Sequence, residues 1–441
     1  MTGPPLVVAP ALPTILAAFP TRILPLKGVL RFALFMPERP EPLSAPIRRS
    51  ILLLSLAAFS SMLAQRICDP MLPEIARSFS VSLTQAAQVV SVFAVIYGLS
   101  QLVYGPLGDR LAKFRIVSLA TLACCLGSVL AVFAASLEWL LLARVLVAMA
   151  AAAIIPLSLA WVGDTVEPAG LQACLARIGL GTTMGVVAGQ LVGGLLVDSL
   201  GWRWAFVFMA LLFGVAGALL MRDWRLQQAV PGWVLRRRPA GGPGFVAQAF
   251  IILTGPWSRL VLLVAFIEGI TGFGVVAIWA SHLHRSLGLA LSAAGAIVAL
   301  YGVGGMLYMA LARHLIRRLN EEQLATLGIC MAGLSALVLG FAPFWWLTAP
   351  ASLLAGFGFF MFHNTLQAKA TQMAPEARAT AVALFALSLF LGQSVGVLLA
   401  SSLLERIGSS MVVALSGGAL GAVGLLFARA LSRRQAKLAA G

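Results

Sequence analysis

Charged residues are scarce in this 441-residue sequence, because only 10% of its positions are Asp, Glu, Lys or Arg, against about 25% in soluble domains. Acids are especially few, with 15 Asp and Glu against 31 Lys and Arg, while apolar residues make up 60%. One water-soluble core cannot absorb that apolar surplus, and a chain so rich in large aliphatic residues is not disordered. Five cysteines are too few, and odd in number, for a secreted disulfide scaffold. The composition therefore indicates an integral membrane protein.

Several catalytic signatures are also missing. The sequence has no Gly-Lys-Ser or Gly-Lys-Thr phosphate loop, so nothing supports ATP-driven transport. The cysteines lack the spacing of metal ligands, and no loop is large enough to house a hydrolase with a His, Asp and Ser constellation. We therefore expect a protein that is not an enzyme and that has no cofactor and no metal site.

Long apolar stretches account for most of the chain. Each is about 20 residues long, which is the length that crosses a bilayer as a helix. The stretches are continuous rather than alternating, which excludes the strands of a membrane barrel. The predicted fold is all-α, with twelve transmembrane helices in two six-helix pseudo-repeats around a central cavity. The windows are 51–68, 86–104, 116–135, 139–162, 178–197, 204–221, 260–279, 291–312, 324–342, 346–367, 381–403 and 412–428.

Most Lys and Arg residues fall in loops that share one side of these spans. Such loops lie in the cytoplasm, so the pattern predicts a multi-pass protein of the bacterial inner membrane with both termini cytoplasmic. Because the basic residues report topology, we expect membrane lipids as partners and no nucleic acid. A cavity inside one chain favours a monomer.

The spans divide into two halves that resemble each other. The predicted halves are 48–222 and 259–430, joined by a cytoplasmic linker at 223–258 and followed by a basic cytoplasmic tail at 431–441. Residues 1–47 are rich in proline and are predicted to be a disordered extension, with Met36 as a hypothetical start of translation. Gly189-Gln190 recurs as Gly392-Gln393, an offset of 203 residues, and Gly193 recurs as Gly396. Repeated halves of this kind are typical of secondary transporters.

The segment after the second span is predicted to be a tight turn, which its glycines permit. Asp109 can accept hydrogen bonds at a helix end, and the basic residues would lie near anionic lipid. The segment resembles the signature between helices 2 and 3 of the major facilitator superfamily. That resemblance implies a gating latch in which Asp109 holds the two halves closed on the cytoplasmic side. The gating residues are Gly105, Gly108, Asp109, Arg110, Lys113 and Arg115.

Two further segments resemble motifs of the same superfamily. Arg144 stands where the helix-4 motif carries a buried arginine, and an arginine in hydrocarbon costs about 2.5–3.5 kcal/mol, so it is expected to face a cavity unless it snorkels to the surface. Glycines spaced four residues apart in the fifth span allow another helix to approach closely. They resemble the helix-5 motif of antiporters, although Gln190 replaces its proline, and close packing without antiport is the alternative. The packing residues are Gly185, Gly189, Gly193 and Gly194.

Ionisable and polar side chains inside the spans are the candidate coupling residues. Arg66 and Asp69 are three residues apart at the end of the first span and can pair, either in the cavity or on an exposed rim. Glu268 stands alone among apolar residues of the seventh span, so it is expected to be either protonated or paired. Other candidates for the proton or substrate cavity are Gln190, Gln393, His363 and Asn364; the histidine is alternatively bound to a carbonyl group.

The resemblance implies a secondary active transporter that exports a drug or metabolite by alternating access, with protons as the coupling ion. In that scheme Glu268 or Asp69 carries the proton, and Arg144 sets the proton affinity of the acid. One alternative is an importer or exchanger of small organic anions, with Arg66 and Arg144 binding the carboxylate. A second alternative is a membrane sensor or scaffold that transports nothing. The sequence does not identify the small-molecule substrate.

Overall fold

The computed structural model describes residues 43–110, 112–228 and 245–440, apart from the side chains of 105–110, 168–169 and 437–440. Within these ranges all regular structure is helical, and twelve helices are long and apolar enough to cross a membrane. The predicted helical fold and its twelve spans are therefore confirmed. The extension predicted at 1–47, including Met36, lies almost wholly outside the described residues, as does the middle of the predicted linker, 229–244.

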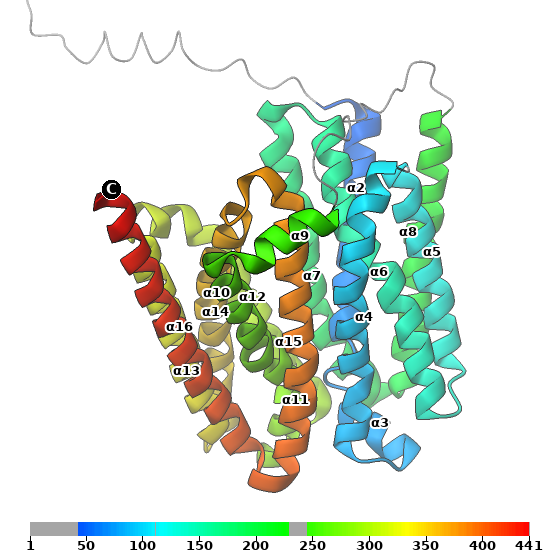
Figure 1. Cartoon of the computed structure of the whole chain (residues 1–441). Coiled ribbons are helices and arrows are strands. Elements are labelled where there is room, and N and C mark those ends of the chain that lie inside the picture. The colour runs from blue at the N-terminus through cyan, green and yellow to red at the C-terminus, as the bar shows by residue number, and fades with distance from the viewer. Residues whose placement is uncertain (1–42, 111, 229–244, 441) are drawn as a thin grey trace, which may run out of the picture. The chain divides into compact units, whose positions relative to one another are not determined.

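The spans form two groups of six that stand next to each other (Figure 1). The first group consists of α2 (Ala45–Arg66), α4 (Leu83–Arg110), α5 (Lys113–Val132), α6 (Leu137–Thr165), α7 (Pro168–Ser199) and α8 (Trp202–Gln228). The second consists of α10 (Pro256–Glu268) with η3 (Gly269–Gly274) and α11 (Val275–Leu287), then α12 (Leu291–Arg318), α13 (Glu321–Phe341), α14 (Trp345–Gln372), α15 (Arg378–Ile407) and α16 (Ser409–Ala440). Short helices are α3 (Leu72–Phe79), α9 (Phe245–Thr254) and η4 (Pro375–Ala377). We call the end where α2 begins and α16 finishes the basic end.

The distribution of side chains is reversed relative to that of a soluble protein. Large apolar residues such as Leu211 and Leu334 are exposed on the outside, whereas Arg144 and Glu268 are buried among the helices. An exterior of this kind suits hydrocarbon, and polar groups inside a membrane protein are expected to face the bundle interior. The interior is consequently where functional side chains gather.

Glycines bring α7 against α2 at backbone distance. A Cβ atom added at Gly189 would lie 2.9 Å from the carbonyl oxygen of Leu63, and one at Gly193 would lie 2.2 Å from that of Ile67. Gly185 packs on the same helix, while the neighbouring Gly194 instead meets the Leu291 carbonyl of α12 in the other group. The packing motif thus joins α7 to helices of both groups.

The second group repeats this contact at the offset seen in the sequence. A Cβ atom at Gly392 would lie 2.0 Å from the carbonyl oxygen of Phe266, and one at Gly396 would lie 2.3 Å from that of Ile270. Leu63 and Phe266, like Ile67 and Ile270, are separated by the same 203 residues as Gly189 and Gly392. The repeat therefore relates pairs of packed helices as well as single residues.

Several helix ends differ from the sequence-based boundaries. The backbone is helical through Arg110, so Gly105 and Gly108 lie in α4, and the expectation that they form the turn is wrong. The helix continues because glycine is tolerated within a helix and the chain needs only two residues to reach Lys113. Helix α9 occupies part of the predicted linker, and α16 extends through most of the predicted tail.

Candidate functional site

Both groups interrupt their first helix at the same point of the repeat. α2 ends at Arg66 and passes into a turn, while α10 gives way at Gly269 to η3, a π-helical segment. These two positions are again 203 residues apart. π-helical insertions are rare and frequently occur at functional sites. The matched interruptions place the candidate site where the two first helices lose their regular backbone.

The sequence around η3 explains how it packs. A Cβ atom at Gly269 would lie 2.2 Å from the Leu389 carbonyl oxygen, and one at Gly272 would lie 2.3 Å from a ring carbon of Phe359. Only glycine allows α15 and α14 to approach this segment so closely. The interruption is therefore covered by helices on two sides.

The first polar cluster lies at the end of α2. The Arg66 guanidinium and the Asp69 carboxylate are 3.3 Å apart, and the Gln190 amide donates a 2.8 Å hydrogen bond to the same carboxylate. Arg66 also donates to the Phe273 carbonyl oxygen in η3 at 3.3 Å and lies over the Phe273 ring. All three polar side chains are buried, so this is not an exposed rim pair. The cluster joins the two helix groups directly.

Asp69 lies in the turn beyond the first span, Ala45–Arg66, and has no exposed surface. Burial raises the pKa of its carboxyl to about 6, although Arg66 and the Gln190 hydrogen bond oppose the shift. Its second oxygen, Oδ1, has no hydrogen-bond partner. Asp69 is thus a buried acid with one oxygen available to a proton or a ligand.

Arg144 is fully buried and does not snorkel. Its side chain donates to the carbonyl oxygens of Ala64 at 2.8 Å and Val89 at 3.2 Å, and its guanidinium lies 4.1 Å from the centre of the Phe93 ring. Arg144 therefore ties α6 to α2 and α4. One nitrogen, Nη2, has no partner.

The second polar cluster lies at the end of α10. Glu268 accepts from, or shares a proton with, Nδ1 of His363 at 3.1 Å, and both residues are buried. The alternative that the sequence left open, a histidine hydrogen-bonded to a backbone carbonyl group, is wrong, because His363 pairs with Glu268. Its ring lies among the rings of Phe273, Phe359, Phe360 and Phe385. The second carboxylate oxygen of Glu268 has no hydrogen-bond partner.

A pair of glutamines joins the two helix groups near the clusters. Gln65 donates a 3.3 Å hydrogen bond to Gln393 across the two helix groups, while Gln190 binds Asp69. Gln65 occupies the repeat position of Glu268, and Gln190 that of Gln393. Asn364, the neighbour of His363, is half-buried. The space between the groups contains buried atoms without hydrogen-bond partners, namely Asp69 Oδ1, Gln190 Oε1, Glu268 Oε2, Tyr301 Oη and Gln393 Nε2.

A small pocket lies beside Gln190 and Tyr301, between helices α2, α7, α11 and α12. It is lined by Arg66, Val186, Gln190, Val276, Val298, Ala299, Tyr301 and Gly302. The lining combines one cation, two uncharged polar groups and apolar walls, and the open space in this conformation is about 10 Å³, roughly that of one water molecule. Within the described ranges no group of three His, Cys, Asp or Glu side chains could hold a metal ion.

Each helix group has an ion pair at the basic end between equivalent helices, with the positions of the acid and the base exchanged. Lys113, at the start of α5, lies 2.6 Å from Asp164 at the end of α6. In the second group Glu321, at the start of α13, lies 2.6 Å from Lys369 at the end of α14. Arg115 lies over the ring of Trp224. The side chains of Asp109 and Arg110 are not among those described, so the latch itself stays a prediction.

Sequence reasoning missed several of these residues. Gln65 and Tyr301 carry no charge and were not candidate site residues, although the 203-residue offset from Glu268 points to Gln65. Asp164 and Glu321 are acids at helix ends, where acids are common, so their positions in the sequence indicate no partner. Their pairing becomes visible only when the helices that carry them are placed together.

Comparison with known proteins agrees with this architecture. The profile of the Major Facilitator Superfamily matches residues 54–397, which is most of the chain. The chain belongs to this superfamily. A bacterial homologue of the human lysosomal transporter Spinster, solved inward-facing and unoccupied, superposes with a TM-score of 0.69 over 88% of this chain and 96% of the other, at 19% identity. At that identity the likeness shows the shared fold.

Among curated superfamily members, similarity is partial. The uncharacterized MFS-type transporter YybF of Bacillus subtilis is 27% identical over 175 residues, which is 40% of this chain and 43% of YybF. The multidrug export protein EmrB of Escherichia coli is 29% identical over 167 residues, which is 38% of this chain and 32% of EmrB. The matched segments thus span less than half the length of either relative.

Proposed function

We propose that this superfamily member is a secondary active transporter that exports a small molecule by proton-coupled antiport. The observation that carries the proposal is the pair of buried acids, Asp69 and Glu268, at the matched interruptions of the first helix in each group. Paired interruptions of this kind form the binding sites of transporters built from repeats. Partial similarity to a multidrug export protein favours export as the direction.

The contacts between the two groups support an alternating-access mechanism. Hydrogen bonds across the groups join Gln65 to Gln393, Ser91 to Ser394, and Asp198 to the backbone of Ser292. These contacts lie in the middle of the spans and toward the end opposite the basic end. The conformation is therefore one in which the far end is closed, and rocking of the groups would have to break these contacts.

Glu268 is the proposed proton carrier. Protonation of this carboxylate removes its charge-assisted hydrogen bond with His363, and deprotonation restores it. The free oxygen Oε2 offers a second position for the proton or for a donor group of the substrate. Substrate and proton would thus compete for the same carboxylate, which is the requirement for antiport. Asp69 is the second proposed proton position, because protonation of its carboxylate would likewise remove the ion pair with Arg66.

Transport in vesicles containing the purified protein tests this assignment. A thermal-shift screen at two pH values would first select a substrate, because a ligand that binds the folded state stabilises it. Glu268→Gln should then reduce transport driven by a pH gradient at least about tenfold, while exchange of labelled for unlabelled substrate continues. Glu405→Gln is the matched control, because Glu405 is exposed near the end of α15. Gradient-driven transport at the wild-type rate in Glu268→Gln would exclude Glu268 as the carrier.

Exchange or import of small organic anions is a second candidate, favoured by the unpartnered Nη2 of the buried Arg144. A carboxylate reaching this nitrogen would be paired with a cation already fixed by two carbonyl groups. The direction in which an imposed pH gradient moves the substrate separates the two functions. A protein that binds a solute but shows neither gradient-driven transport nor exchange would instead be a sensor or scaffold.

A further inference from the structure

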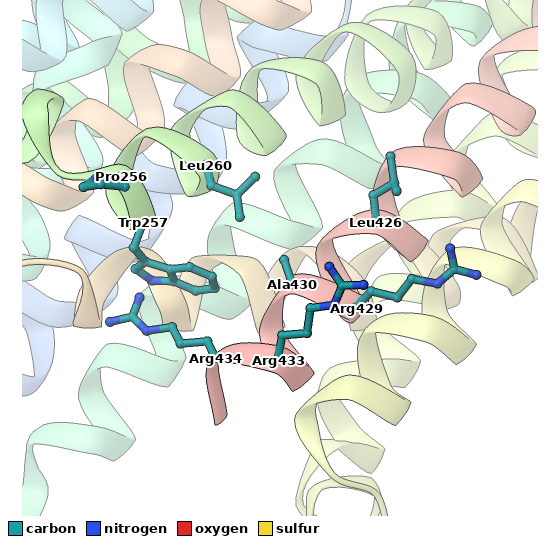
Figure 2. Close-up of a pocket in the computed structure, with 8 residues that line it drawn as sticks. All are labelled: Pro256, Trp257, Leu260, Leu426, Arg429, Ala430, Arg433 and Arg434. Carbon is teal, nitrogen blue, oxygen red and sulfur yellow. The ribbon is translucent and has the colours of Figure 1, made fainter. Parts of the chain in front are cut away.

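A surface groove runs between α10 and α16 at the basic end (Figure 2). It is separate from the buried clusters, because it opens on the outside of the second helix group. Its lining residues are Pro256, Trp257, Leu260, Leu426, Arg429, Ala430, Arg433 and Arg434.

The part of the groove nearer the basic end carries positive charge without a matching acid. Arg429 and Arg433 are one helical turn apart on α16, both exposed, and neither has an ion-pair partner among the described residues. Arg434 lies over the indole of Trp257, with its guanidinium 4.2 Å from the ring centre (Figure 2). No lining residue is acidic. This part of the groove therefore attracts an anion.

The part of the groove further from the basic end is apolar. Leu260 and Leu426 lie further from the basic end than Trp257 and the arginines, along α10 and α16 respectively. A tryptophan at this level is characteristic of the boundary between headgroups and hydrocarbon. The groove thus changes from cationic to apolar along the direction in which a phospholipid changes from headgroup to acyl chain.

Helix α9, which directly precedes α10, places the same boundary at this level. It lies across the bundle near the basic end (Figure 1) and has no charged residue. Val246, Phe250 and Ile251 are exposed, whereas Ile252 is buried. An exposed apolar face on a helix of this kind packs into the interfacial region of a bilayer.

We propose that this groove binds one anionic phospholipid. Its phosphate would accept hydrogen bonds from Arg429 and Arg433, and an acyl chain would lie along Leu260 and Leu426. Basic pockets between transmembrane helices bind anionic headgroups such as that of cardiolipin. The apolar wall favours a lipid over free phosphate, which would gain only the arginine contacts.

Lipid binding by the full-length protein in detergent tests this assignment. Native mass spectrometry would compare phosphatidylglycerol with phosphatidylcholine at equal concentration, and inorganic phosphate would be added as a competitor. The wild type should retain phosphatidylglycerol preferentially, and excess phosphate should not displace it. Arg429→Gln with Arg433→Gln should weaken phosphatidylglycerol binding about tenfold or more, because each surface arginine contributes substantially to anionic-lipid attraction.

The matched control is Arg317→Gln with Arg318→Gln, which removes two exposed arginines at the basic end of α12. This control should bind phosphatidylglycerol like the wild type. Equal loss in both double variants would show diffuse charge attraction and overturn the site. If the α16 variant does not fold, the wild type alone decides, because equal retention of the two lipids or displacement by phosphate also overturns the proposal.

Discussion

A close helix contact in the second group, between α15 and α10, should tolerate no added methyl group. Gly392 faces the Phe266 carbonyl oxygen, and a Cβ atom there would lie 2.0 Å from it, against 3.4–4 Å for ordinary contact. Gly392→Ala would thus force α15 and α10 apart by about 1.4 Å at this point. Because Gly396 makes a similar contact one turn along, the strain cannot be relieved by tilting alone.

The expected cost follows from that separation. Overpacking a tight contact typically costs about 1–3 kcal/mol, and here the opposing atom is backbone, which cannot rotate away. In a chain of 441 residues a loss of that size should lower the thermal midpoint by about 1–3 °C. The opposite sign is expected for Gly418→Ala, because nothing lies within 4 Å of a Cβ atom at that helical position.

Thermal unfolding of the purified variants in one detergent measures both effects. Gly392→Ala should melt below the wild type, and Gly418→Ala at or above it. If Gly392→Ala melts with the wild type, α15 and α10 do not pack at the distance described. If both variants fall equally, the effect belongs to helical glycine in general and the argument from contact distance fails.

Two further perturbations test the ionic contacts. Lys369→Glu should lower the free energy of unfolding by less than about 1 kcal/mol, because Glu321 is partly exposed, and the thermal midpoint should fall slightly. Adding Glu321→Lys should restore the midpoint; a double variant no more stable than the single one would mean that the pair contributes nothing. Because burial raises the pKa of Asp69 from 3.8 to about 6, the folded state holds the proton more tightly than the unfolded chain, and its stability falls as pH rises from about 4 to 6. Melting at pH 4 and 7 should therefore show Asp69→Asn gaining on the wild type with rising pH, and a constant difference would contradict the raised pKa.

The site was predictable in part, for identifiable reasons. Glu268 and Arg144 stand out because an ionisable residue in a long apolar run must find a partner or a cavity. Their partners could not be inferred, because the Ala64 and Val89 carbonyl groups that bind Arg144 belong to other helices. His363 was a candidate, yet its pairing with Glu268 joins residues 95 positions apart.

Sequence alone determined the number of spans, their helical character and the internal repeat. Those features depend on run length and on residue identity at a fixed offset, and both are local or periodic properties of the chain. Tertiary structure decided which buried groups meet: Arg66 with Asp69 and Gln190, Glu268 with His363, and Gln65 with Gln393. These contacts depend on how far each helix is rotated and where its backbone is interrupted. Such rotations are set by backbone contacts at glycines, as between Gly392 and Phe266, rather than by hydrophobicity, which is nearly uniform around helices that lie in lipid.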